Sequence, residues 1–341
     1  MSQPLNCDDL KFSLHPSVQD TKIYKRYYRD GRWEAGQIVP FQNFSLSPAA
    51  NILNYGQGIF EGLKAYYSSR GKVVLFRPEM NARRFYVSAE RLAIPPIPPE
   101  QFVEAVKATV LANLDFIPQS TDGRCSMYLR PVCIATEPQL GVNAAQEYLF
   151  YIFGSPVGPY FHKDPVVRLL VTDVHRAAPR GTGDVKAVCN YAVTMRPKRE
   201  AKAKGFNDAL YLDPVHNRYI EEAGAANVFV LLKNDVLVTP NLGAILPGIT
   251  RDSIITLARD QFGLQVQERE VSIEEVLFES KEVFLTGTAA IVASVSEIGW
   301  KDEVYSVNRN DYALARQLYQ KLTGIQLQKE PDPYHWVVEL T

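Results

Sequence analysis

The chain has 341 residues, which at roughly 100–200 residues per domain indicates about two domains. Hydrophobic residues make up 46% of it and charged residues 22%, which excludes a mainly disordered chain. Lys and Arg number 37 against 38 Asp and Glu, so there is no charge excess for binding nucleic acid or an anionic membrane. No apolar run reaches the ~20 residues that span a bilayer, and the polar N-terminus lacks signal-peptide or transit-peptide character. We therefore expect a cytoplasmic protein without nucleic-acid or membrane partners.

The usual signatures of several enzyme classes are absent from the sequence. It contains no P-loop, no H-E-x-x-H and no G-x-S-x-G. The absence of a G-x-G-x-x-G after a strand disfavours a nucleotide-binding oxidoreductase. The five histidines lie far apart, and no C-x-x-C pair occurs among Cys7, Cys125, Cys133 and Cys189. We therefore expect reduced thiols and no metal site.

Hydrophobic periodicity predicts strands and helices mixed along the first half. In chain order these are a strand at Val73–Phe76, a helix from Pro78 to about Arg91, a helix from Pro99, and strands at Ser126–Ile134 and Tyr148–Phe153. The helix from Pro99 carries an apolar stripe of Val103, Val106, Val110 and Leu114. Alternation in the strand at Ser126–Ile134 places Tyr128 and Arg130 on the face opposite Met127.

A stretch dense in Gly and Pro, Gly154–Tyr160, is the best candidate for a linker. We expect a mixed α/β protein with a small N-terminal domain at 1–154, a linker at 155–166 and a large domain at 167–341. The elements predicted for the large domain are strands at Val167–Asp173, Leu210–Asp213 and Arg218–Glu221, a hairpin of Asn227–Leu232 and Val236–Val238, a helix at Ser253–Phe262, a capping box at Ser272–Glu275, a strand at Glu282–Leu285, and a helix from Asp311 to Thr323 that stops at Gly324.

Lys186 is the first residue whose surroundings suggest a role in catalysis. It follows a Gly-rich loop and is flanked by Val185 and Ala187. A lysine in apolar surroundings loses its proton more easily and becomes an amine nucleophile. Most lysines are exposed, so a solvent-facing loop residue is the alternative.

Three other segments suit an anion or a flat ring. Leu246–Arg251 leads into a predicted helix, where free N–H groups and the Thr250 hydroxyl suit a phosphate, although Thr250 equally suits an N-cap. Leu285–Ala290 is a second small, hydroxylated segment, or else a tight turn. Glu221 and Glu222 precede a run of small residues that could admit a ring, unless both are solvated edge carboxylates. A lysine, two potential anion-binding segments and a carboxylate are together the groups that bind pyridoxal 5′-phosphate (PLP).

Longer motifs point in the same direction. Three spaced segments are Glu222-Ala-Gly-Ala-Ala-Asn-Val-Phe229, Leu237-Val-Thr239 and Leu246-Pro-Gly-Ile-Thr-Arg251. Further distinctive stretches are Tyr55–Lys64, Phe76–Asn81, Tyr128–Pro131, Glu137–Val142 and Ser155–Phe161. In these motifs the chain resembles the branched-chain amino acid aminotransferases, which are fold type IV, class IV PLP-dependent enzymes, over nearly its whole length. The resemblance implies a smaller N-terminal and a larger C-terminal α/β domain with the cofactor at their interface.

The resemblance assigns eight residues to PLP. Lys186 would form the Schiff base and move a proton between the substrate Cα and the cofactor C4′. Glu222 would pair with the pyridine nitrogen, and Tyr191 would hydrogen-bond the phenolic oxygen. The expected phosphate ligands are Arg84, Ile249, Thr250 and Thr288, and Leu246 would pack on the ring.

The resemblance also implies a pocket for a branched, apolar side chain. Its expected aromatic walls are Tyr55, Phe60, Tyr128 and Tyr160. Thr288 and Ala289 would receive the α-carboxylate, and Arg130 the γ-carboxylate of the second substrate. Leu140 and Val142 resemble a loop that reaches the neighbouring subunit's site, which implies a homodimer.

The implied reaction is a reversible, ping-pong transamination of leucine, isoleucine or valine with 2-oxoglutarate, giving branched-chain 2-oxo acids and glutamate, with amino-acid biosynthesis as the expected setting. Two alternatives stay open. One is another fold type IV enzyme, such as a D-amino acid or amine aminotransferase or an aminodeoxychorismate lyase. The other is a noncatalytic ligand-binding protein. The chain departs from animal relatives at Ala290 and Ala293, which replace a redox C-x-x-C, and at Ala225, which replaces a Thr.

Overall fold

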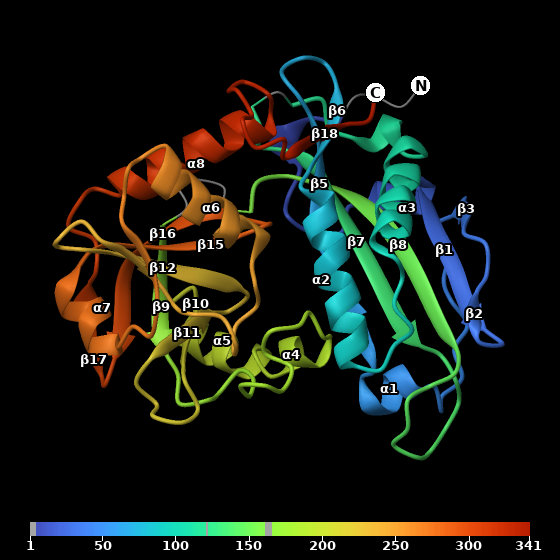
Figure 1. The fold of residues 1–341 in the computed structure, drawn as a ribbon, viewed down its shortest axis with the longest axis horizontal. Helices are drawn as coiled ribbons and strands as arrows, with labels where there is room; N and C mark the ends of the chain where they lie inside the picture. The colour runs from blue at the N-terminus through green and yellow to red at the C-terminus, as the bar shows by residue number, and fades with distance from the viewer. Residues whose placement is uncertain (1–4, 121, 161–165) are drawn as a thin grey trace. The chain divides into compact units, whose positions relative to one another are not determined.

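The computed structural model describes residues 5–120, 122–160 and 166–341, which divide into two compact units. Unit 1 comprises residues 5–160 together with Lys186–Cys189 and Thr323–Thr341. Unit 2 comprises residues 166–185 and Asn190–Leu322. Within these residues each unit contains one nine-stranded sheet (Figure 1). The predicted linker at 155–166 begins inside a strand that runs to Val157, and its residues 161–165 lie outside the described part of the chain.

The sheet of unit 1 is antiparallel at every described pairing. Its order is β18 (Val337–Glu339), β6 (Val73–Phe76), β5 (Leu63–Tyr67), β7 (Ser126–Ala135), β8 (Tyr148–Val157), β1 (Lys22–Arg29) and β2 (Arg32–Trp33), with β3 (Gln37–Pro40) beside β1 and β4 (Gly58–Phe60) beside β7. Helix α3 (Pro99–Leu111) packs on β1 and β8, and α2 (Pro78–Arg91) packs on α3 and β4. Shorter helices are α1 (Asn51–Tyr55) and the 3-10 turns η1 (Cys7–Asp9), η2 (Pro16–Asp20) and η3 (Leu114–Phe116).

The core of unit 1 explains one difference from the predicted pattern. The bounds predicted for β6 and α2 are confirmed, and α3 begins at Pro99 as expected. The buried face of α3, however, contains Phe102, whereas Leu114 is 39% exposed. The Phe102 ring lies 5.0 Å from the Phe85 ring and 6.1 Å from the Phe150 ring, between centroids. Val106 and Val110 of the predicted stripe are buried on the same face, so Phe102 extends that stripe at its start, whereas Leu114 lies beyond the end of α3 at Leu111.

The sheet of unit 2 is mixed. Its order is β11 (Ile220–Ala223), β10 (Asp208–Leu212), β9 (Val166–Val171), β16 (Ile291–Trp300), β15 (Ser280–Gly287), β12 (Ala226–Leu232), β13 (Leu237–Thr239) and β14 (Val266–Glu268), with β17 (Glu303–Ser306) beside β16. The additional pairing of β11 with β12 closes six strands into a ring. The predicted hairpin is confirmed as β12 and β13.

Helices α6 (Ile249–Asp260) and α7 (Ile273–Glu279) pack on β15, and α5 (Met195–Ala203) packs on β10. The remaining helices are α4 (Cys189–Ala192) and α8 (Ala313–Gln326). None of the helices in the described ranges is long and apolar enough to cross a membrane.

Two helix ends differ from the prediction. Helix α6 begins at Ile249, four residues before Ser253, with Gly248 as its N-cap. Helix α8 continues through Gly324, where we expected it to stop. A Cβ at Gly324 would lie 2.5 Å from Glu330 Cγ, so this glycine allows a close approach rather than ending the helix. The N-cap half of the predicted capping box is confirmed, because the Ser272 hydroxyl accepts the Glu275 N–H at 3.1 Å, while the Glu275 carboxylate accepts hydrogen bonds from Arg269.

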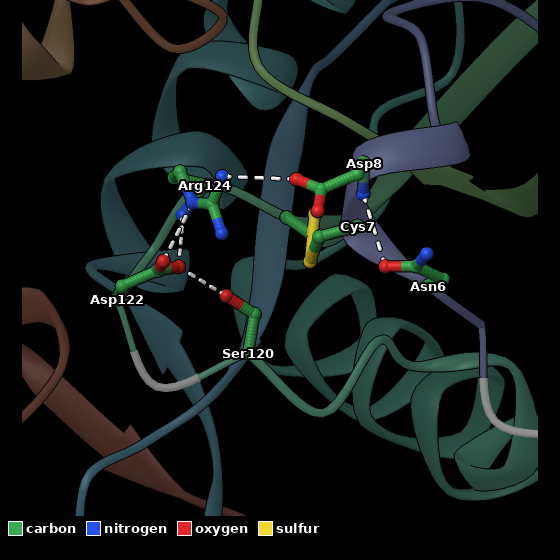
Figure 2. The surroundings of a disulfide bond; sticks show 7 residues. Asn6, Cys7, Asp8, Ser120, Asp122 and Arg124 are labelled. Carbon is green, nitrogen blue, oxygen red and sulfur yellow. Dashed lines mark hydrogen bonds and ion pairs between the residues drawn. A yellow bond between two sulfur atoms is a disulfide. The ribbon is translucent and has the colours of Figure 1, made fainter.

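The expectation of reduced thiols is wrong for two cysteines. Cys7 and Cys125 form a disulfide with their Cα atoms 5.8 Å apart, across a sequence separation of 118 residues. The neighbouring Arg124 guanidinium contacts the Asp8 carboxylate (Figure 2), with 3.1 Å between Nη1 and Oδ1. Spacing alone could not show this pairing, because it depends on where the segment before β1 lies relative to β7. Cys133 and Cys189 form no disulfide.

Candidate active site

Lys186 lies on a short segment of unit 1 that pairs with β4. The Phe60 N–H donates to the Lys186 carbonyl at 3.1 Å, and the Val188 N–H donates to the Gly58 carbonyl at 3.0 Å. The Lys186 N–H donates to Ser88 Oγ on α2 at 3.0 Å. Its Nζ lies 4.7 Å from the centroid of the Phe60 ring. The backbone of this lysine is therefore fixed from both sides, and its amine lies against an aromatic face.

Arg84 is held by a buried carboxylate that was not among the predicted site residues. Glu61 is 0% exposed, and it accepts Arg84 Nε at 2.7 Å, Arg84 Nη2 at 2.8 Å and Asn81 Nδ2 at 2.8 Å. Burial alone would raise the pKa of Glu61, but Arg84, Lys186 and Asn81 together hold this pKa below its ordinary value. A Glu inside the apolar run Ile-Phe-Glu-Gly was the available signal, because a buried carboxylate needs a charged partner.

Aromatic residues and one arginine gather along β4, β7 and the end of β8. The Arg130 guanidinium carbon lies 4.8 Å from the Phe60 ring centroid and 5.3 Å from that of Tyr128. Arg130 Nε is buried without a hydrogen-bond partner among the described residues. Phe12, which no sequence motif indicated, packs edge-on against Tyr128 at 5.3 Å and Tyr160 at 5.0 Å. Unit 1 thus brings together three of the four predicted aromatic walls and the predicted carboxylate-binding arginine.

The fourth predicted wall, Tyr55, ends helix α1 and is 40% exposed. Its hydroxyl donates to the Leu140 carbonyl, so the structure joins Tyr55 to the loop expected to reach a second subunit. Leu140 is 86% exposed and Val142 is 84% exposed. Two neighbouring apolar side chains with this exposure are unusual on a surface that nothing covers.

In unit 2, Glu222 on β11 is held by at least three donors. Its Oε1 accepts the Leu246 N–H at 2.6 Å and Asn227 Nδ2 at 3.2 Å. Its Oε2 lies 2.7 Å from Arg176 Nη1, and both side chains are buried. Hydrogen bonds and a cation around a carboxylate favour its charged form. No signal in the sequence marked Arg176, because a single arginine outside a motif is usually a surface residue.

Glu221 is also buried, so the alternative of two solvated edge carboxylates is wrong. Burial, followed by the charges of Glu222 and Asp213, raises the pKa of Glu221 to about 7, and Arg176 opposes this shift. Tyr191 lies on α4, with its ring centroid 5.7 Å from the Arg176 guanidinium carbon.

The start of α6 places Ile249 and Thr250 in the first turn, so Thr250 is not the N-cap that we considered. The N-cap residue is Gly248, which has no side chain to cap the first N–H groups of the helix. A Cβ at Gly248 would lie 2.0 Å from Asn227 Oδ1, so only glycine fits there. The first N–H groups of this helix are of the kind that bind phosphate. The predicted carboxylate ligands Thr288 and Ala289 lie in the turn between β15 and β16.

The residues present fit PLP. The start of α6 supplies N–H donors and a hydroxyl for a phosphate, and Glu222 is an oriented carboxylate for a protonated ring nitrogen. Thr286 Oγ1 at the end of β15 is buried without a hydrogen-bond partner among the described residues, as expected where a ligand completes the bonding. In unit 1, the anchored Lys186 has an amine of the type that binds the aldehyde of PLP.

Comparison with known proteins agrees with this chemistry. A family model described as "Amino-transferase class IV" matches residues 58–298. The chain is 46% identical over 341 residues to "Branched-chain-amino-acid aminotransferase 5, chloroplastic" of Arabidopsis thaliana, covering 99% of this chain and 80% of that protein. The chain belongs to the branched-chain amino acid aminotransferases of class IV. A second relative, "Branched-chain-amino-acid aminotransferase 1, mitochondrial" of the same plant, is 45% identical over 336 residues, covering 98% of this chain and 86% of that protein.

A solved branched-chain amino acid aminotransferase of T.th. with pyridoxamine 5′-phosphate has a TM-score of 0.76 and 27% identity, covering 93% of this chain and 98% of that chain. The predicted fold type IV, mixed α/β class is confirmed, as are the aminotransferase activity and PLP as the cofactor. These relatives disfavour the D-amino acid, amine and lyase alternatives. The predicted cytoplasmic location is contradicted, because the plant relatives are named chloroplastic and mitochondrial.

Proposed function

We propose that this enzyme exchanges amino groups between leucine, isoleucine or valine and 2-oxoglutarate in two half-reactions, with Lys186 as the acting base. The observation that carries this assignment is the anchored Lys186 segment, whose amine lies 4.7 Å from the Phe60 ring. The cluster of Phe60, Tyr128 and Arg130 offers both kinds of contact that the two substrates need. Its rings suit a branched apolar side chain, and its guanidinium suits a γ-carboxylate.

When bound, PLP supplies an electron-withdrawing ring that stabilises negative charge at the substrate Cα. Lys186 Nζ carries the proton between the substrate Cα and the cofactor C4′. Glu222, held by at least three donors, keeps a proton on the pyridine nitrogen. Tyr191 would donate to the phenolic oxygen, and Leu246, whose N–H donates to Glu222, would pack on the ring.

The first turn of α6, through Ile249 and Thr250, would bind the phosphate together with Thr288 and Arg84. The bidentate bond to Glu61 fixes the plane of the Arg84 guanidinium before any ligand arrives. Thr288 and Ala289 receive the substrate α-carboxylate through the turn after β15.

The enzyme works as a homodimer and has no membrane or nucleic-acid partner. Support for the dimer comes from Leu140 and Val142, which are 86% and 84% exposed on a loop bonded to Tyr55. A second copy of the chain would bury them. Sedimentation velocity tests this proposal, and a monomer at micromolar concentration contradicts it.

Absorbance spectroscopy tests the function. The purified protein should show a yellow PLP band that bleaches with L-leucine alone and returns with 2-oxoglutarate. Lys186→Ala should lose catalytic turnover in both half-reactions. A band that responds to D-amino acids or amines but not to L-leucine refutes the substrate assignment, and substantial turnover by Lys186→Ala refutes the role of the lysine.

A further inference from the structure

Arg176 is a buried arginine to which the proposed reaction assigns no role. It lies in the segment after β9, and its side chain is 4% exposed. Its Nη1 contacts Glu222 Oε2 at 2.7 Å, and the Glu222 side chain is 2% exposed. A buried arginine without a charged partner is strongly unfavourable, so the two groups hold each other in place.

Among the donors to Glu222 described above, Arg176 is a cation. Leu246 and Asn227 donate neutral hydrogen bonds to the other carboxylate oxygen. Neutral donors orient a carboxylate, but a cation at 2.7 Å does more to keep it ionised in a dry environment.

Glu221 and Tyr211 are two further titratable groups close to Arg176, and neither is a cation. Glu221 is the adjacent residue on β11, and its negative charge would favour a proton on Glu222. Burial, together with Asp208, raises the pKa of Tyr211 to about 12, so this hydroxyl stays neutral. The Tyr191 ring lies 5.7 Å from the Arg176 guanidinium carbon. Arg176 therefore places a positive charge in direct contact with Glu222.

We infer that Arg176 is a positioning residue that keeps Glu222 ionised and oriented, and thereby keeps the pyridine nitrogen of PLP protonated. The inference rests on the proposed role of Glu222. It predicts that a neutral residue at position 176 weakens the reaction through the protonation state of the ring nitrogen rather than through substrate binding.

The test compares the holoenzyme with Arg176→Met, Arg176→Lys and Glu222→Gln, each loaded with nitrogen-15-labelled PLP. The nitrogen-15 chemical shift reports protonation of the ring nitrogen directly. Wild type should show the protonated signal at pH 7.5, Arg176→Lys should retain it, and Arg176→Met should move toward the unprotonated signal, as Glu222→Gln does. With leucine, kcat of Arg176→Met should fall on the order of 100-fold with KM changed much less.

The nitrogen-15 measurement distinguishes an error in the proposed role of Glu222 from an error in the role of Arg176. If Glu222→Gln leaves the nitrogen signal unchanged, the proposed role of Glu222 is wrong, and the inference falls with it. If Glu222→Gln shifts the signal but Arg176→Met does not, only the role of Arg176 is overturned. If Arg176→Met does not fold, a pH titration of the nitrogen-15 signal in Arg176→Lys tests the inference instead. Its nitrogen signal should titrate at lower pH than in wild type, and an unchanged titration overturns the inference.

Discussion

Replacing Glu221 with Gln should stabilise the protein at alkaline pH and leave its stability unchanged at acid pH. Burial, with the charges of Glu222 and Asp213, raises the pKa of Glu221 from 4.5 to about 7. Between these values the folded state holds a proton that the unfolded chain has lost. The free energy of unfolding contributed by this group therefore falls as pH rises from about 4.5 to about 7. At roughly 1.4 kcal/mol for each pKa unit, the difference from 4.5 to about 7 corresponds to ~3 kcal/mol.

The assay is urea denaturation of wild type and Glu221→Gln with saturating PLP at pH 4 and pH 8. Because Gln resembles the protonated carboxyl, the variant should match wild type at pH 4 and exceed it by ~3 kcal/mol at pH 8. The control is Glu279→Gln, whose side chain is 58% exposed and pairs with Lys233 at 3.4 Å. It should change stability by less than about 1 kcal/mol at both pH values. An equal gain for Glu221→Gln at pH 4 and pH 8, or none at pH 8, refutes the reasoning.

Three further outcomes follow from the structure. Cys7→Ser removes a disulfide that spans 118 residues and should lower the free energy of unfolding by ~4 kcal/mol. The control Cys189→Ser should change it by under about 0.5 kcal/mol. Equal effects of the two variants in urea denaturation would mean that the disulfide does not form. Arg130→Ala should lower kcat/KM about 100-fold for 2-oxoglutarate but less than about 10-fold for leucine, as measured by steady-state kinetics. Equal losses of kcat/KM for the two substrates would contradict the role of Arg130. Ser272→Ala removes the 3.1 Å capping bond of α7 and should cost ~1 kcal/mol, while Ser272→Asp should restore it; a loss that Asp does not recover excludes capping as the cause.

Local patterns in the sequence predicted local structure well. Pro78 and the apolar run before it marked β6 and α2, because a missing N–H and a fixed φ suit the first turn of a helix. Ser272 and Glu275 marked α7, because the capping bond joins residues three apart. The alternation in β7 placed Met127 and Tyr128 on opposite faces, and the structure buries Met127 while Tyr128 packs against Phe12. Each of these signals operates within a few residues of the chain.

Features that depend on contacts between distant segments were not predicted. Nothing near Arg176 in the sequence indicates that it meets Glu222, and nothing near Cys7 indicates Cys125. Phe102 took the core position because Phe85 and Phe150 surround it, which a stripe read from one helix cannot reveal. The proposed cofactor residues came from a motif resemblance, while the groups that orient them, such as Glu61, came from the structure.

The way unit 1 is assembled from the chain has a consequence for folding during synthesis. Its sheet takes strand β18 from Val337–Glu339 as the neighbour of β6, and β4 takes its backbone partner from the segment of Lys186. A nascent chain that ends near residue 160 would therefore leave the β6 edge and the β4 backbone without these partners. All residues of unit 2 precede residue 323, whereas unit 1 needs the residues from Thr323 onward. Unit 1, whose synthesis begins first, is therefore the unit that completes its folding last. Separating the two units by cutting the chain near residue 160 would leave unit 1 without its proposed catalytic lysine.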